Sequence, residues 1–259
     1  KNSMILLEKI DNVGKITLNR PEKFHSFIRE MALELQKNLD ICEENSDIRS
    51  VMITANGKAF CAGQDLEEAI DPNGPDISTI ILEHYNPIIR KVRKLKKPVI
   101  AAVNGVAAGA GASLALSCDI VVASEKASFI QAFSKIGLVP DSGSSYFLPR
   151  LIGLQKTTAL MMTADKVSAH EAEQIGMIYK VYSEQEFHQM SWQLAVKLSK
   201  MPTKALSLTK DLLNVSLENN LEQQLNIEEK NQSIAAQTQD YREGVQAFLE
   251  KRIANFKGK

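Results

Sequence analysis

The feature that most constrains the fold is a pattern that occurs twice in the first half of the chain. Apolar, β-branched runs of strand length begin at Val51 and Val99, and each leads through a loop to Ala-Gly, at Ala62-Gly63 and at Ala108-Gly109. Apolar runs without polar alternation are typical of strands that are buried on both faces. The repeat therefore predicts an α/β core in which strands and helices alternate.

The segments around the repeat fit this expectation. We predict a hairpin from 5–10 and 14–18, strands at 50–54, 99–103 and 120–123, and helices at 29–44, at 78–97 with a kink at Pro87, and up to about Leu116. From about residue 155 the pattern becomes almost entirely helical. We accordingly divide the chain into a core domain, residues 1–200, and a helical C-terminal region, residues 201–259.

Composition and charge exclude several functions. The 259 residues include 31 basic and 31 acidic side chains, so the net charge is zero, whereas nucleic-acid binding depends on an excess of positive charge. Apolar residues make up 44% of the chain, as in ordinary globular proteins. No apolar run approaches the ~20 residues of a membrane helix, and no signal peptide opens the sequence. We expect a cytoplasmic protein that has neither nucleic acid nor a membrane as its partner.

Cysteine and histidine spacing gives no sign of a metal site. The three cysteines contain no C-x-x-C pair, and no two of the four histidines stand four residues apart. We expect Cys61 and Cys118 to be small core residues. The sequence thus predicts no bound metal.

The two Ala-Gly loops suggest a binding site for an oxygen anion. Small residues let the backbone approach a ligand, and N–H groups at a helix start are free to donate. Main-chain N–H groups of Gln64 and Ala110 would then form an oxyanion hole, aided by the dipole of the helix that follows Ala110. The same residues would also occur if Ala and Gly only allowed a strand and a helix to pack closely. A dinucleotide site is excluded, because the third glycine of its fingerprint would fall at Leu114.

These loops also carry a resemblance to a known family. The sequence resembles the enoyl-CoA hydratase/isomerase, or crotonase, family over essentially its whole length. The matching segments are 18–21, 59–66, 97–115, 118–120, 137–141, 168–169, 176–178 and the terminal helix. The resemblance implies a spiral of ββα units, a helical C-terminal region that forms a homotrimer or homohexamer, and an acyl-CoA thioester as substrate.

The resemblance further assigns individual residues. Coenzyme A enters as part of the substrate, and no prosthetic group is implied. The expected CoA contacts are Lys23, His25, Ala62, Gly63, Asp65, Leu66 and Gly109. His25 departs from the asparagine usual in the family, and Ser142 to Ser145 depart from its usual Gly-Gly-Thr.

The acid/base residue decides which reaction such a chain performs. Hydratases of the family use two glutamates, and the resemblance places Ser113 and Phe133 at those positions here. Asp141 remains, after an apolar stretch that would raise its pKa, and isomerases of the family carry an aspartate there. We predict an isomerase that acts through Asp141, with closest likeness to the branch that converts 1,2-epoxyphenylacetyl-CoA to its oxepin; the alternative isomerase reaction is a 3-enoyl to 2-enoyl shift.

Other interpretations stay open at this point. Asp141 could simply cap the helix that begins near Ser142. The chain could hydrate enoyl-CoA without the glutamate pair, or bind acyl-CoA as a scaffold without catalysis. Residues 111–115 approximate a serine-hydrolase elbow at Ser113, with Asp141 and His170 or His188 as partners. Finally, the six basic residues within 90–97 are expected to face water at the end of their helix.

Overall fold

The computed structural model describes residues 3–259. The chain begins with the predicted hairpin, in which β1 (Ile5–Ile10) and β2 (Val13–Leu18) pair antiparallel. Asp11 and Asn12 join them with φ values of 50° and 62°, and Asp and Asn tolerate this left-handed conformation better than most residues do. The hairpin forms one edge of a six-stranded sheet.

The remaining strands of this sheet are parallel to β2 and to one another. They are β3 (Ser50–Ala55), β5 (Val99–Val103), β7 (Ile120–Ser124) and β10 (Lys180–Tyr182), in the order β1-β2-β3-β5-β7-β10. Every residue of β3 and of β5 is buried, which confirms the prediction from their apolar runs.

A second, four-stranded sheet explains the repeat in the sequence. It consists of β4 (Ala59–Cys61), β6 (Val106–Ala108), β8 (Ser128–Ile130) and β9 (Lys166–Ser168), in the order β4-β6-β8-β9. The strand pairs β3–β4, β5–β6 and β7–β8 each place their first strand in the large sheet and their second in the small one. The two copies of the pattern therefore lie side by side, and Val51 pairs with Val99.

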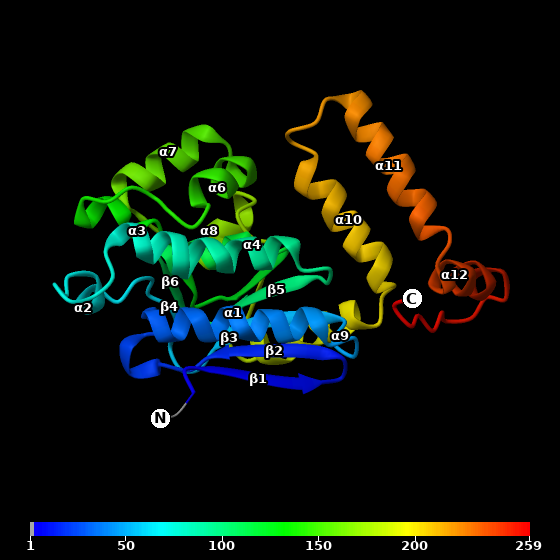
Figure 1. Ribbon diagram of the computed structural model, residues 1–259, viewed down its shortest axis with the longest axis horizontal. Coiled ribbons are helices and arrows are strands. Elements are labelled where there is room, and N and C mark those ends of the chain that lie inside the picture. Colours follow the sequence, from blue (N-terminus) through cyan, green and yellow to red (C-terminus); the bar gives the residue numbers. More distant parts are fainter. Residues whose placement is uncertain (1–2) are drawn as a thin grey trace.

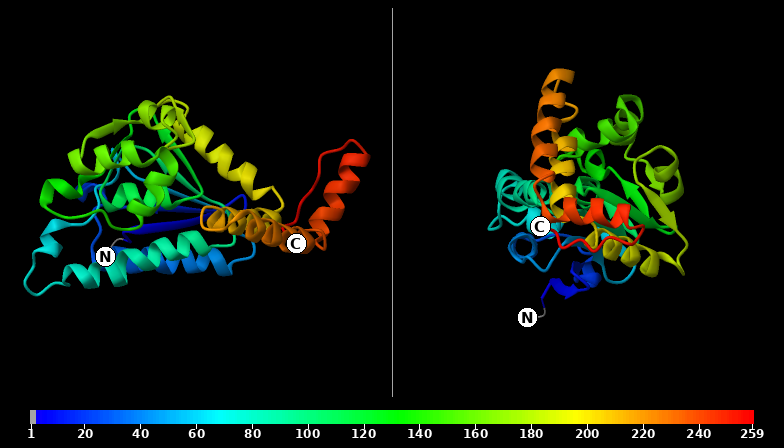
Figure 2. Two further views of the ribbon diagram at one scale, coloured as in Figure 1. Left: turned by 90° about the horizontal axis from the view of Figure 1, so that it is seen from above. Right: turned by 90° about the vertical axis from the view of Figure 1, so that its right-hand side faces the viewer.

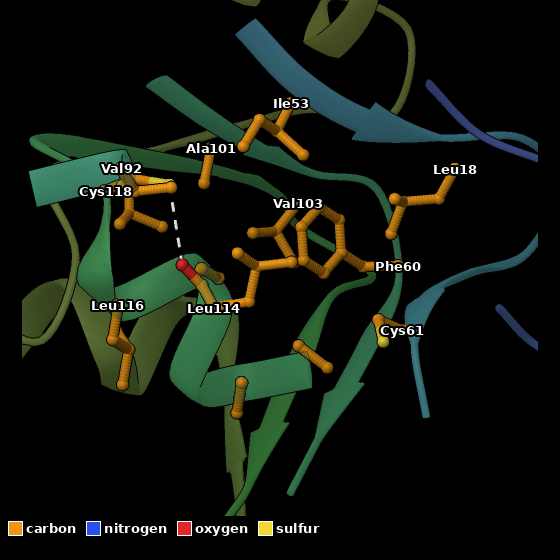
Figure 3. Close-up of a cluster of buried hydrophobic side chains, with 14 of the residues drawn as sticks. Leu18, Ile53, Phe60, Cys61, Val92, Ala101, Val103, Leu114, Leu116 and Cys118 are labelled. Atoms are coloured by element: carbon orange, nitrogen blue, oxygen red, sulfur yellow. Dashed lines mark hydrogen bonds between the residues drawn. The ribbon is translucent and has the colours of Figure 1, made fainter. Parts of the chain in front are cut away.

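Helices cover both sheets and enclose the core. The helix α1 (Arg29–Glu44) has the predicted bounds, and α5 (Ala110–Ser117) has all eight residues buried. A Cβ atom on Gly111 would lie 2.3 Å from the Cys61 carbonyl oxygen, so α5 packs directly against β4. Figure 3 shows the ring of Phe60 beside Val103 and Leu114 in the core that this packing closes.

The helical segment after the acidic loop differs from the prediction at its end. It comprises α3 (Ile77–Thr79), the π-helix η2 (Ile80–Tyr85) and α4 (Asn86–Lys94), so it stops short of residue 97. Lys97 is 7% exposed, and its ammonium donates to the carbonyl groups of Cys42, Glu43 and Asn45 at the end of α1. The expectation that the whole basic cluster faces water was wrong, because Lys97 stabilises the C-terminus of another helix.

The other elements complete the first two hundred residues. They are the 3₁₀-helices η1 (Pro21–Lys23) and η3 (Ala132–Ile136) and the helices α2 (Leu66–Ala69), α6 (Ser144–Ile152), α7 (Leu154–Thr163), α8 (Ala169–Gln174) and α9 (Phe187–Ser199). The helix α9 is tied to the large sheet, since Ser50 donates to its Ala195 carbonyl at 2.8 Å.

Three further helices extend away from the core on one side (Figures 1 and 2). They are α10 (Thr203–Val215), α11 (Leu221–Ala235) and α12 (Gln239–Leu249). Ion pairs attach α10 to the core, because the buried Lys210 and the partly buried Arg93 both contact the Asp119 carboxylate, at 2.8 and 3.0 Å. The division of the chain at residue 200 stays a prediction. Within residues 3–259, no helix combines the length and apolar character that crossing a membrane requires.

Candidate active site

The two Ala-Gly loops come together at one end of the small sheet. Because β4 and β6 are neighbours, Ala62-Gly63 and Ala108-Gly109 lie next to each other. A Cβ atom on Gly63 would stand 3.0 Å from the Ala108 carbonyl oxygen and 3.3 Å from the Ala110 nitrogen. Gly63 also has φ of 92°, which favours glycine. The loops can approach this closely only because residue 63 has no side chain.

The second loop supplies the N-terminus of a buried helix. Gly109 is the N-cap of α5, and its own N–H donates to Ile130 in β8 at 2.9 Å. The first helical hydrogen bond runs from Ser113 to the Gly109 carbonyl, so the N–H of Ala110 precedes the helical ladder. This N–H, together with the positive end of the α5 dipole, can bind an anionic oxygen.

The first loop is held by the segment before α1. Phe27 donates to the Gly63 carbonyl at 2.7 Å and accepts from the Asp65 N–H at 2.9 Å. These bonds form a parallel bridge between Phe27 and Gln64, which turns the N–H of Gln64 away from Phe27. Gln64 thus presents its N–H on the other side of the strand.

A buried tyrosine fixes the Gln64 side chain. The Tyr85 hydroxyl donates to Gln64 Oε1 at 2.8 Å, and Gln64 Nε2 donates to Glu68 at 2.9 Å. The Tyr85 ring packs edge-on against Phe27, with centroids 5.9 Å apart. Burial raises the pKa of Tyr85 well above its usual value, so the hydroxyl keeps its proton and remains a donor.

Asp141 acts electrostatically on the same tyrosine. Its negative charge is one of the causes that raise the Tyr85 pKa. Burial raises the pKa of Asp141 itself, partly offset by the Ser142 hydroxyl, which donates to Asp141 Oδ1 at 2.9 Å. The capping interpretation was wrong, because the N-cap of α6 is Gly143 and no side chain caps that helix. The Asp141 carboxylate is therefore free of a structural role in the helix.

Ser113 and Phe133, the positions that the resemblance aligns with the glutamates of hydratases, carry no carboxylate. Ser113 is fully buried, and its hydroxyl donates back to the Gly109 carbonyl at 3.2 Å. Phe133 Cζ lies 4.0 Å from where a Cβ of Gly109 would be, so its ring borders the second loop. The serine-hydrolase interpretation was also wrong, since Ser113 lies inside α5 while His170 and His188 are exposed on α8 and α9.

The predicted CoA contacts fall into two groups. Ala62 and Leu66 are exposed, and Lys23 is partly exposed and paired with Glu67 at 2.9 Å. By contrast, His25 is fully buried, and its ring nitrogens contact the Arg20 N–H and the Asn56 carbonyl at 2.9 and 2.6 Å.

Asp65 belongs to the buried group as well. It is 6% exposed, pairs with Arg20 at 2.8 Å and caps α2 by accepting from the Glu67 N–H. The side chains of His25 and Asp65 hold the loops in place, and neither offers an exposed surface for CoA.

Sequence reasoning did not give a role to Tyr85 or Ser142. Tyr85 ends a π-helix, an irregularity that often marks functional sites, but its contacts to Phe27 and Gln64 join distant parts of the chain. The turn from Ser142 to Ser145 departs from the Gly-Gly-Thr usual in the family, and this departure was the only signal available.

Grooves elsewhere in the molecule lack this combination of groups. One of about 630 Å³ lies between α4, α6 and α10 and is lined mainly by apolar side chains around the ion pairs of Asp119. Among residues 3–259, no three His, Cys, Asp or Glu side chains are grouped to hold a metal. The two Ala-Gly loops remain the best candidate, because they approach each other closely and because Tyr85, which holds Gln64, is also influenced by the charge of Asp141.

Comparison with known proteins places this geometry in a family. Residues 8–259 match the model of the enoyl-CoA hydratase/isomerase family. The chain belongs to that family. It is 45% identical to a 1,2-epoxyphenylacetyl-CoA isomerase of Escherichia coli, over 95% of each chain. It is also 35% identical to a mitochondrial enoyl-CoA hydratase of Pongo abelii, over 96% of this chain and 85% of the relative.

Solved structures confirm the fold class. An enoyl-CoA hydratase/isomerase from Cupriavidus metallidurans superposes with a TM-score of 0.92 at 34% identity, covering 100% of this chain and 97% of the other. The expected crotonase fold, with strand pairs in two sheets and a helical C-terminal region, is therefore correct. Membership of the enoyl-CoA hydratase/isomerase family does not choose between isomerase and hydratase, because relatives carry both names.

Proposed function

We propose that the protein is an acyl-CoA isomerase that stabilises a thioester enolate. The observation that carries this proposal is the half-buried carboxylate of Asp141, which has no capping role and acts electrostatically on Tyr85, the residue that holds Gln64. The N–H groups of Gln64 and Ala110 would hold the thioester oxygen as negative charge develops on it. No prosthetic group is needed for this chemistry.

The proton transfer follows from this arrangement. Asp141 removes a proton from the carbon next to the thioester, the C–H electron pair moves into the carbonyl, and the oxygen becomes an enolate. In a 3-enoyl-CoA the same Asp141 then returns the proton to the γ carbon, and the double bond moves from C3–C4 to C2–C3. The raised pKa of Asp141 suits a group that must both accept and release a proton.

The substrate class is proposed from the relatives. Similarity to the 1,2-epoxyphenylacetyl-CoA isomerase favours an aryl ring epoxide, and the 3-enoyl shift is the aliphatic alternative. The ring of Phe133 supports an apolar acyl group beside the second loop. CoA would contact Lys23, Leu66 and the backbone at Ala62, Gly63 and Gly109, while His25 and Asp65 support the loops.

Hydration and a purely binding role are less well supported. Addition of water uses one group to activate the water and a second to protonate carbon, and Ser113 and Phe133 supply neither. A scaffold would have no use for a half-buried carboxylate, because burying a charge costs stability.

The proposal is tested by a substrate panel. We expect 3-enoyl-CoA or 1,2-epoxyphenylacetyl-CoA to be isomerised and 2-enoyl-CoA not to be hydrated. Asp141→Asn should lower kcat by about 10³-fold, within the range for loss of an acid/base group. The exposed Asp165 offers a matched control, Asp165→Asn, which should leave kcat unchanged. Hydration at a rate above isomerisation would favour the alternative.

We also propose that the protein forms a homotrimer or homohexamer through its C-terminal helices. Large apolar side chains on and beside α12 are open to solvent, with exposures of 82% at Phe248 and 92% at Ile253. Contact with a second copy of the chain would remove them from water. Light scattering of the full chain should give three or six subunits, and a monomer would contradict this assembly.

A further inference from the structure

The turn that carries Asp141 contains an unusual backbone conformation. Ser142 has φ of 53° and Gly143 has φ of 77°, so two consecutive residues lie in the left-handed region. Glycine adopts this region freely, whereas a serine is strained there. Ser142 is also only 2% exposed, so it is not a water-facing turn residue. Glycine would be the simpler choice at position 142.

The serine hydroxyl makes a contact that glycine could not make. Ser142 Oγ donates to Asp141 Oδ1 at 2.9 Å. The main chain of Asp141 is fixed separately, because Ser144 donates to its carbonyl oxygen from the backbone N–H at 3.1 Å and from Oγ at 3.0 Å. The turn is therefore closed by Ser144, and the Ser142 hydroxyl acts on the carboxylate alone.

This contact distinguishes the two carboxylate oxygens. Oδ1 accepts from Ser142, while Oδ2 accepts no hydrogen bond from any residue in the described range 3–259. The hydrogen bond to Oδ1 restricts rotation of the carboxylate about its Cβ–Cγ bond. Oδ2 is then the oxygen available to take a proton from a substrate.

We propose that Ser142 is a positioning residue for the proton transfer, and that its strained backbone is retained because it places the hydroxyl on Asp141 Oδ1. This inference rests on the proposed function, in which Asp141 is the base. Strain of this kind persists where the surroundings require one conformation, as at catalytic sites.

The charged and titratable surroundings define the expected pH effect. The Ser142 hydroxyl lowers the pKa of Asp141 by stabilising the carboxylate, against the rise caused by burial. The charge of Asp141 acts on Tyr85 of η2, as do those of Cys61 at the end of β4, Asp65 at the N-cap of α2 and Glu68 within α2. Since all of them raise the pKa of Tyr85, that side chain stays neutral while Asp141 titrates.

Two substitutions separate the hydroxyl from the strain. Ser142→Ala removes the hydroxyl and keeps the strain, whereas Ser142→Gly removes both. In each variant we expect the acidic limb of the kcat profile to move to higher pH by about one unit, because loss of the hydrogen bond raises the Asp141 pKa. At pH values below the limb kcat should fall about tenfold, while KM stays unchanged.

If Ser142 had only a structural role, activity would change together with the melting temperature, and the pH profile would not shift. We expect Ser142→Gly to melt at a higher temperature than Ser142→Ala, although both show the same shifted profile. Ser145→Ala, in the exposed first turn of α6, is the matched control and should keep the wild-type profile. Activity that tracks melting temperature, with an unmoved acidic limb, would overturn the role of Ser142.

Asp141→Asn, assayed in parallel, separates this inference from the proposed function. Loss of activity in Asp141→Asn together with unshifted Ser142 variants would refute only the positioning role. Full activity in Asp141→Asn would refute the function on which it rests.

Discussion

The two loops that form the candidate oxyanion hole are built by different means. Ala108 to Ala110 lead into α5, in which every residue is buried, so packing of this helix and pairing with β8 fix the position of this loop. Ala62 to Gln64 lead into α2, a helix of four residues with none buried. This second loop is held by hydrogen bonds from Phe27 and Tyr85, far away in the sequence. The N–H of Ala110 is thus fixed by the core, and the N–H of Gln64 by a few polar contacts.

Among substitutions in the two loops and their supports, the largest effect is expected where the loops approach each other most closely. Gly63→Ala adds a Cβ atom 3.0 Å from the Ala108 carbonyl and requires an unfavourable φ of 92°. The loops must separate, and we expect kcat for isomerisation to fall at least ~100-fold, as when an oxyanion-hole donor is lost. Gly176→Ala provides the control, because Gly176 also has a left-handed φ of 80° but has only an ordinary contact at 3.5 Å. A Gly63→Ala enzyme with more than half of the wild-type kcat would show that the loops do not act together.

Removal of the tyrosine hydroxyl tests the polar support of the first loop. Tyr85→Phe keeps the ring against Phe27 but loses the hydrogen bond to Gln64. We expect kcat to fall about tenfold with little change in KM, since a looser Gln64 N–H weakens the transition state more than binding. Tyr182→Phe, at a buried tyrosine of β10, should have no such effect. Equal kcat values for both variants would mean that the loop needs no support from Tyr85.

The smallest effect is expected at the exposed rim of the first loop. Lys23 and Glu67 form a pair with side-chain exposures of 43% and 81%, and such pairs add little to stability. If Lys23 contacts the phosphates of CoA, Lys23→Ala should raise KM by about threefold, and salt should reduce the difference. Glu67→Gln, which frees Lys23, should lower KM. A KM that does not respond to either substitution would remove Lys23 from the CoA site.

The difference between a loop fixed by its neighbours in the sequence and a loop fixed by distant residues also explains what could be predicted from the sequence. The loop before α5 was predicted well, because an apolar strand, small residues and a short apolar helix follow one another in the chain. The helix over 29–44 and the hairpin were predicted for the same reason, since their patterns are local.

Features that depend on distant contacts could not be predicted. Lys97 caps a helix that ends more than fifty residues earlier, and Tyr85 reaches Gln64 across the acidic loop. The sequence also left open whether Asp141 caps α6. Ser142 has a left-handed φ, and the helix begins only at Ser144, after the turn that contains Asp141. Burial and side-chain direction decide these cases, and neither is encoded in a short stretch of sequence.

Stability provides a check on variants at Asp141. Because burial raises its pKa in the folded state, the ionised carboxylate costs stability above the pKa of the unfolded chain, and this cost disappears at lower pH, where both states are protonated. Asp141→Asn should therefore be at least as stable as the wild type at pH 7 and lose that advantage near pH 3. Thermal melts at the two pH values measure this directly, and a less stable variant at pH 7 would contradict the burial argument.

We expect Asp141 and the two loops to act together in converting a bound thioester to its enolate. The most direct measurement is exchange of the α protons of phenylacetyl-CoA in deuterated water, followed by NMR. The wild type should exchange them, and Asp141→Asn should slow exchange by about 10³-fold while binding the same CoA thioester with similar affinity. Equal exchange by wild type and Asp141→Asn would contradict a role for Asp141 in forming the enolate.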